Sequence, residues 1–188
     1  MPTRHMGSPV GYKERLSELR EHLPADTEWV HAVTKLNSLG VESTEIESCL
    51  PCHSVYFLTA LHIANERGID HIAAGYAGYQ SAWLEQTPDA LDRVTKVMAS
   101  VGKTFLVPVK DVPSKDDAKS ILRSYNVSDV ALEQKCLKQQ FNAKEIQADI
   151  ASKEIDKWGR NLERVLALSN ALDFVEIRNS STFRESTS

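Results

Sequence analysis

The chain contains few cysteines and no long hydrophobic run. Only three of its 188 residues are cysteines, whereas a small secreted domain held together by disulfides carries many, usually in even number. No apolar stretch approaches the roughly 20 residues of a membrane-spanning helix, and residues 1–16 contain no apolar segment of signal-peptide length. These absences argue against a disulfide-rich secreted domain and a membrane protein, so we expect a cytoplasmic protein.

The sequence also lacks an excess of positive charge. With 22 Lys and Arg against 26 Asp and Glu, the net charge is −4, so no overall positive field draws the protein to nucleic acid or anionic lipid. Hydrophobic residues make up 41% and charged residues 26%, as in ordinary globular proteins. We expect a single domain at residues 1–178 and a polar, disordered tail at residues 179–188.

Helical and strand patterns alternate along the chain. Apolar residues at helical spacing predict helices at residues 11–22, 51–68, 87–102, 114–127 and 142–169. Short apolar or alternating runs predict strands at residues 28–36, 69–74 and 104–109. Gly68, Gly102 and Asn126 lie where helix C-terminal caps are expected. The alternation predicts a three-layer α/β/α fold with an open, mostly parallel sheet and a helical C-terminal portion.

The stretch "CLPCH" at residues 49–53 is the first candidate site. Cys49 and Cys52 lie at the start of an expected helix, where amide dipoles favour the thiolate that attacks carbon or sulfur and binds metals. The stretch also fits the C-x-x-C-H pattern that attaches c-type haem. That attachment usually occurs in exported chains, and no methionine stands out as an axial ligand. A redox or metal-binding cysteine pair is therefore favoured.

Cys136, in "ALEQKCLKQQ", follows a later helix and could converge on the same sheet edge as this pair. Three thiolates can hold an iron–sulfur cluster with one open iron, or zinc with His53 as the fourth ligand. The competing interpretation is that each thiol is a small buried apolar group. Cys49, Cys52 and Cys136 are thus candidate catalytic and metal-binding residues.

The loop "GYAGYQ" follows the expected strand 69–74, and open parallel sheets bind ligands beyond the carboxyl ends of their strands. Gly75 and Gly78 would let the backbone approach a ligand. Tyr76 offers a ring for stacking and Gln80 an amide for hydrogen bonding. A structural turn with an aromatic lid would explain the same residues.

The stretch "VKDVPSKDD" adds Lys115 as a candidate phosphate contact, although a capped, solvated helix start explains most of its charges. No Ser-His-Asp ordering, H-E-x-x-H, Walker A or G-x-G-x-x-G pattern is present in the chain. The residues alone therefore indicate an α/β domain with a thiol-bearing helix start and a glycine loop.

Over roughly residues 45–140, the succession from "CLPCHSVYFL" through "TFLVPVKDVPSKDDAKSIL" to "ALEQKCL" resembles the PP-loop ATP pyrophosphatases. The order of elements is similar to that of 7-cyano-7-deazaguanine synthase-like proteins, and the cysteine spacing to that of tRNA-thiolating enzymes. The resemblance implies a ligase that uses ATP with magnesium to adenylate a carboxylate or carbonyl. Its substrate would be a 7-deazaguanine-type base precursor of queuosine biosynthesis, or a tRNA that receives sulfur.

The resemblance also assigns roles to residues. Cys49 or Cys52, with Cys136, would relay sulfur or bind a cluster or zinc, and Gly75 with the loop after it would border the nucleotide. One departure is that the family's S-G-G-x-D-S loop, whose amides bind phosphates, is absent from the chain. We therefore expect a fragment, a domain that no longer turns over ATP, or a domain whose partner subunit supplies the loop. A homodimer is the other assembly that we expect. A non-catalytic interaction module that uses the "GYAGYQSAW" surface is the alternative from another class.

Overall fold

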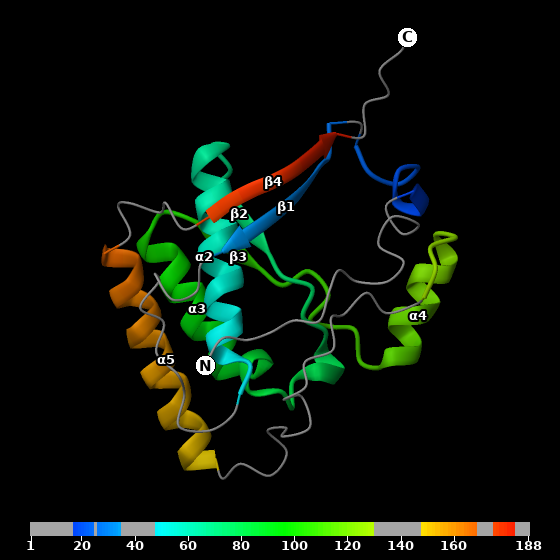
Figure 1. Cartoon of the computed structure of the whole chain (residues 1–188). Coiled ribbons are helices and arrows are strands. Elements are labelled where there is room, and N and C mark those ends of the chain that lie inside the picture. Colours follow the sequence, from blue (N-terminus) through cyan, green and yellow to red (C-terminus); the bar gives the residue numbers. More distant parts are fainter. Residues whose placement is uncertain (1–16, 25, 35–47, 130–147, 169–174, 183–188) are drawn as a thin grey trace.

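The computed structural model describes residues 17–24, 26–34, 48–129, 148–168 and 175–182 (Figure 1). Its helices are α2 (Leu50–Glu66), α3 (Pro88–Ser100), α4 (Lys115–Ser124) and α5 (Ala148–Leu168), with short 3-10 helices η2 (Gly78–Gln80) and η3 (Leu84–Gln86). Its strands are β1 (Glu28–Thr34), β2 (His71–Ala73), β3 (Thr104–Leu106) and β4 (Val175–Thr182). Within these residues, no helix combines the length and the hydrophobicity needed to cross a membrane.

Helices α2, α3 and α4 end in the same way. Gly68 (φ 64°), Gly102 (φ 75°) and Asn126 (φ 53°) adopt the left-handed conformation, which glycine adopts without steric cost and asparagine tolerates. The next N–H in each case returns to a carbonyl of the last helical turn: Ile69 to Ala64 at 2.8 Å, Lys103 to Met98 at 3.0 Å and Val127 to Leu122 at 2.9 Å. The three expected C-terminal caps are therefore confirmed.

Two small sheets are present in the described residues, and the protein is a mixed α/β structure. Strands β2 and β3 are parallel, with His71 opposite Thr104 and Ala73 opposite Leu106. Helix α3 connects them, so β2, α3 and β3 form one βαβ unit. The described strands show a two-stranded parallel sheet and not the larger three-layer sheet that the alternation predicts.

The second sheet differs from the sequence-based expectation. Strand β1 lies within the expected strand 28–36, but it pairs antiparallel with β4. Residues 179–182, whose polar composition predicts a tail, form the second half of β4. A strand ladder is held by backbone groups, so pairing with β1 can order polar residues that composition alone assigns to a tail. Residues 183–188 lie outside the described part of the chain.

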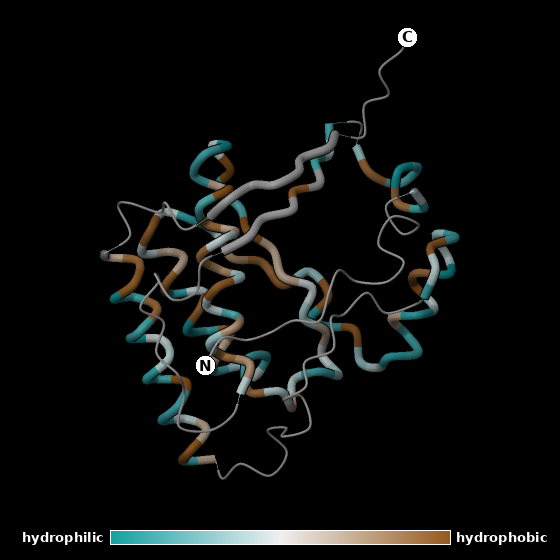
Figure 2. Tube along the Cα trace, in the orientation of Figure 1, coloured by the Kyte–Doolittle hydropathy of each residue, from teal (hydrophilic) through white to brown (hydrophobic). Residues whose placement is uncertain are grey.

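The hydrophobic core lies between α2, α3, α5 and the β2–β3 pair. Phe57 of α2 packs edge-to-face on Phe105 of β3, with ring centroids 5.5 Å apart, and its ring lies 6.2 Å from that of Trp158 of α5. Figure 2 shows hydrophobic and hydrophilic residues alternating along α5. Its buried residues include Ile155, Trp158, Leu162 and Val165. This amphipathic spacing explains why α5 packs with one side on the core.

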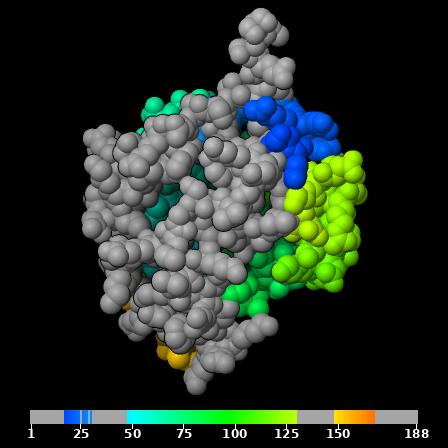
Figure 3. Space-filling view, turned by 45° about the vertical axis from the view of Figure 1, so that its right-hand side comes forward, coloured from blue at the N-terminus to red at the C-terminus, as the bar shows by residue number. Residues whose placement is uncertain are grey.

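Helix α4 lies apart from this core and has no buried residue. It lies beside residues 17–24, as Figure 3 shows. The rings of Tyr125 and His22 are 5.7 Å apart, and the Ser128 N–H donates to Glu18 Oε2 at 2.8 Å. The described end of the expected helix 11–22 is thus joined to the segment that follows α4.

Candidate functional site

The candidate site lies where the start of α2 meets the chain that leaves β2. Strand β2 follows α2 and runs in the opposite direction. The carboxyl end of β2 therefore lies near the first turn of α2. There His53 Nδ1 is hydrogen-bonded to the hydroxyl of Tyr76, three residues beyond β2. This is the end of a parallel sheet at which α/β proteins bind ligands.

Glu85 faces the other nitrogen of the same imidazole. Its Oε1 atom lies 4.0 Å from His53 Nε2, and the side chains of His53 and Glu85 are only 13% and 6% exposed. Glu85 belongs to η3, in the segment that connects β2 to α3. We call His53, Tyr76 and Glu85 the His53 cluster. It brings an imidazole, a phenol and a carboxyl group together in a largely buried place.

Burial dominates the protonation of all three groups. Desolvation lowers the pKa of His53 to about 4, so the imidazole is neutral at pH 7. The pKa of Tyr76 is raised by burial and further by negative charge on Glu85, Tyr56 and Cys49. Burial also raises the pKa of Glu85, against hydrogen bonds from its own backbone and from Gln86. A neutral imidazole between a phenol and a carboxyl group can both donate and accept a proton, as acid–base catalysis requires.

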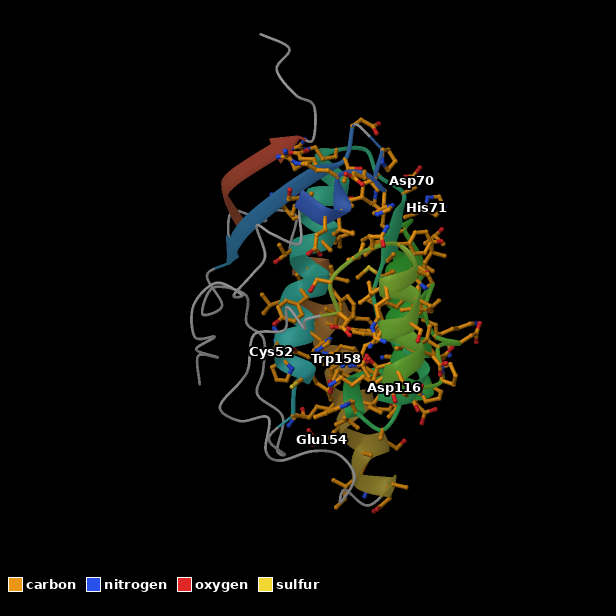
Figure 4. All side chains as sticks on the ribbon, turned by 90° about the vertical axis from the view of Figure 1, so that its right-hand side faces the viewer. Cys52, Asp70, His71, Asp116, Glu154 and Trp158 are labelled. Carbon is orange, nitrogen blue, oxygen red and sulfur yellow. The ribbon has the colours of Figure 1, made fainter. Side chains whose placement is uncertain are left out.

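Both cysteines of the C-x-x-C motif lie at this end of α2. Cys49 is the N-cap residue, its side chain makes no capping hydrogen bond, and it is partly exposed. Cys52 is 7% exposed and belongs to the buried residues of α2 (Figure 4). Pro51 lies in the first turn, where its fixed φ suits a helix start.

The metal-binding expectation rests on three cysteines, of which the structure describes Cys49 and Cys52. Among the residues that the structure describes, no three His, Cys, Asp or Glu side chains gather as a metal-binding group. His53, the fourth ligand suggested for zinc, is hydrogen-bonded to Tyr76 through Nδ1, which leaves Nε2 as the nitrogen that could bind a metal. Cys136 lies outside the described residues, so its convergence with Cys49 and Cys52 stays a prediction.

The residues of the "GYAGYQ" loop have different surroundings. Among the described residues, no atom lies within 4 Å of a Cβ built on Gly75, so the space next to this glycine is open. A Cβ at Gly78 would instead lie 2.5 Å from the backbone oxygen of Lys110, which gives this glycine a packing role. Gln80 Oε1 accepts from the Ala77 N–H at 3.4 Å, within the loop itself. Tyr76 is the loop residue that joins the His53 cluster.

Lys115, the candidate phosphate contact, is exposed at the first position of α4. It belongs to α4, which lies apart from the core on which the His53 cluster packs. Its proposed role therefore stays a prediction without structural support.

Glu85 is the site residue that the sequence does not reveal by motif. The sequence carries one weak indication of its role. Glu85 is an acidic residue directly after the apolar residues Trp83 and Leu84, shortly before the Thr87 cap of α3. The buried Oε1 atom of neighbouring Gln86 has no hydrogen-bond partner in the described structure. A buried acceptor next to Glu85 leaves one hydrogen bond for a water or a ligand.

Comparisons with protein-family models, with curated proteins and with solved structures found no match to this chain. Its function is therefore inferred from the site and from the sequence patterns.

Proposed function

We propose that this chain is a nucleotide-binding domain of the PP-loop ATP pyrophosphatase kind, resembling 7-cyano-7-deazaguanine synthase-like proteins. It would use ATP with magnesium to adenylate a carboxylate or carbonyl on a 7-deazaguanine-type base precursor. The observation that carries the proposal is the His53 cluster, because it gathers buried acid–base groups at the carboxyl end of a parallel strand.

The fold proposal goes beyond the two described parallel strands. We infer that β2 and β3 belong to a larger open sheet with helices on both faces. In support, parallel sheets occur almost only where both faces are covered. Here Ile72 and Phe105 are buried on one face, whereas Leu106, on the other, is 41% exposed. A second copy of the chain or a partner subunit would complete this sheet, and a partner subunit of different sequence would supply the phosphate-binding loop that this sequence lacks.

The chemistry proposed for the chain's own residues is proton handling. A nitrogen nucleophile that attacks an adenylated carboxylate loses a proton as the new bond forms and AMP leaves. Tyr76, hydrogen-bonded to the neutral imidazole of His53, is placed to take that proton as its own passes to Nδ1. Glu85 Oε1, which lies 4.0 Å from Nε2, would stabilise the resulting imidazolium when its carboxyl group is ionised.

A second candidate is sulfur transfer to tRNA, which the two cysteines beside the cluster favour. In that reaction a cysteine would carry the sulfur and the His53 cluster would accept the proton.

A non-catalytic interaction module is the third candidate, favoured by the exposed ring of Tyr79, which is 39% accessible.

The test is calorimetric titration of the full chain with ATP and magnesium, followed by measurement of pyrophosphate release with a carboxylated 7-deazaguanine and an ammonium salt, or with tRNA. The proposal expects ATP binding, and pyrophosphate release that depends on the deazaguanine. His53→Asn and Tyr76→Phe should each lower that release by about 100-fold, the usual size of an acid–base contribution.

His71→Asn is the matched control, because His71 is exposed at the start of β2 and Figure 4 shows it apart from Cys52. It should leave pyrophosphate release unchanged. Release that depends on tRNA alone would select the sulfur-transfer alternative. No binding of ATP and no release with either substrate would reject the enzymatic proposals in favour of an interaction module.

A further inference from the structure

We propose that Cys49 and Cys52 form a reversible dithiol–disulfide pair that exchanges with small-molecule disulfides. This inference goes beyond the nucleotide chemistry proposed above and does not depend on it. It rests on the placement of the two thiols at the start of α2 and on their unequal exposure.

The spacing of the two residues permits a disulfide after a small movement. Cys49 is the N-cap and Cys52 the third helical residue of α2. Residues three apart on a helix have Cβ atoms about 5–6 Å apart, whereas a disulfide needs about 3.5–4.5 Å. Closing this gap tightens only the first turn, in which the His53 N–H donates to Cys49 O at 3.0 Å. A bond formed under such strain is easily reduced, as in redox-active disulfides.

The exposure of the two residues indicates which thiol reacts first. Cys49 is partly exposed and can meet a disulfide in solution, whereas Cys52, at 7% exposure, is shielded from it. An accessible attacking thiol with a buried resolving thiol is the arrangement that prevents the mixed disulfide from persisting.

The exchange balances without another reactant. The Cys49 thiolate attacks one sulfur of glutathione disulfide, a Cys49–glutathione bond forms, and one glutathione thiolate leaves. The Cys52 thiolate then attacks the Cys49 sulfur and displaces the second glutathione thiolate. The protein loses two electrons and two protons, and one glutathione disulfide becomes two molecules of glutathione.

The redox state of the pair would be sensed at the His53 cluster. Burial is the main cause that raises the pKa of Tyr76, and negative charge on Cys49 is the smallest of the four causes. A disulfide carries no such charge. Oxidation of the pair therefore changes the electrostatic surroundings of the phenol that we place in the candidate site.

The test equilibrates the reduced full chain with chelator in mixtures of reduced and oxidised glutathione, blocks free thiols with iodoacetamide, and analyses tryptic peptides by mass spectrometry. Trypsin should place Cys49 and Cys52 on one peptide, residues 36–67, and Cys136 on another. The proposal expects the 36–67 peptide to lose two hydrogens while Cys136 stays alkylated. The proposal would be overturned if Cys49 and Cys52 were both alkylated in the most oxidising mixture, or if either formed a disulfide with Cys136.

Single variants test the assigned order. Cys52→Ala should accumulate glutathione on Cys49 because the resolving thiol is gone, and Cys49→Ser should leave Cys52 unmodified. Glutathione on Cys52 in the Cys49→Ser variant would contradict the order and the shielding on which the inference rests. Circular dichroism of each variant verifies that it is folded, and Cys52→Ser replaces Cys52→Ala if the latter is not.

Discussion

His53 is 13% exposed, and its two ring nitrogens face Tyr76 and Glu85. Burial holds its pKa at about 4, compared with 6.5 for a solvated histidine. The folded protein therefore keeps this imidazole neutral under conditions in which the unfolded chain protonates it. At the scale of the residue, this difference couples the candidate site to the pH dependence of stability.

We expect the free energy of unfolding to fall as the pH drops from 6.5 toward 4. In this range the unfolded chain takes up a proton at His53 and the folded protein does not, a difference of about 3 kcal/mol at most. His53→Asn should remove this part of the acid sensitivity. The measurement is urea unfolding at a series of pH values, and an unchanged slope in the variant would contradict the prediction.

Glu85 should act in the opposite direction. Its pKa is raised in the folded state, so the folded protein binds this proton more readily than the unfolded chain and gains stability as the pH falls through the folded-state pKa. Glu85→Gln should therefore make the acid-induced loss of stability steeper than in the parent chain. The same urea series measures it, and a shallower slope would show that burial does not raise the pKa of Glu85.

Gly78 and Gly75 form a matched pair for a test of packing. Gly78→Ala would place a Cβ 2.5 Å from Lys110 O and 3.1 Å from Val112 O, both backbone atoms that cannot turn away. We expect a loss of about 1–3 kcal/mol in unfolding free energy. Gly75→Ala meets no atom within 4 Å and should change it by about 0.5 kcal/mol or less. Equal effects in chemical denaturation would contradict this assignment.

At the scale of the element, one buried hydrogen bond joins α2 to α5. The Trp158 Nε1–H donates to Ser54 Oγ at 2.6 Å, and the Ser54 hydroxyl donates in turn to Leu50 O at 3.3 Å. Both side chains are almost fully buried. The pair satisfies polar groups that would otherwise be costly in the core, and it sets the register of the two helices.

Removing both partners of this bond should cost less than the sum of the two single losses. Ser54→Ala leaves the buried indole N–H without an acceptor and should lower the unfolding free energy by about 1–3 kcal/mol. Trp158→Phe should have an effect of similar size, because it also reduces the buried ring area. In a double-mutant cycle, the double variant should lose less than the sum of the two single variants. Strict additivity would show that the bond contributes nothing to stability.

At the scale of the whole molecule, the ring of Phe57 connects three elements. It lies against Phe105 of β3 and Trp158 of α5 while belonging to α2, and it is 4% exposed. Residues distant in the sequence therefore share one hydrophobic core. This arrangement predicts that α2, α5 and the parallel sheet unfold together.

Phe57→Ala should lower the unfolding free energy by about 3–5 kcal/mol, because it leaves a cavity where the three elements meet. Tyr56→Ala is the control, since that neighbouring ring is 48% exposed and its loss should cost about 1 kcal/mol or less. Unfolding followed by both tryptophan fluorescence and circular dichroism should give coincident transitions. Separate transitions would show that the elements do not form one cooperative unit.

The local sequence determined where the described helices begin and end and which thiols lie at a helix start. Caps such as Gly68 and Gly102 act through neighbours a few residues away, so the pattern is sufficient to predict them. It also predicted the mixed α/β class, because hydrophobic periodicity reports which side of each element is buried.

Tertiary structure alone decided how these elements combine. Tyr76 is hydrogen-bonded to His53, 23 residues away in the sequence, and Trp158 to Ser54, 104 residues away. Glu85 lies beside His53 and is buried there, although no sequence motif identifies it. Strand β4 includes the polar residues 179–182 because β1 lies beside it. Such contacts require distant segments to be brought together, and periodicity within one segment carries no information about its partner.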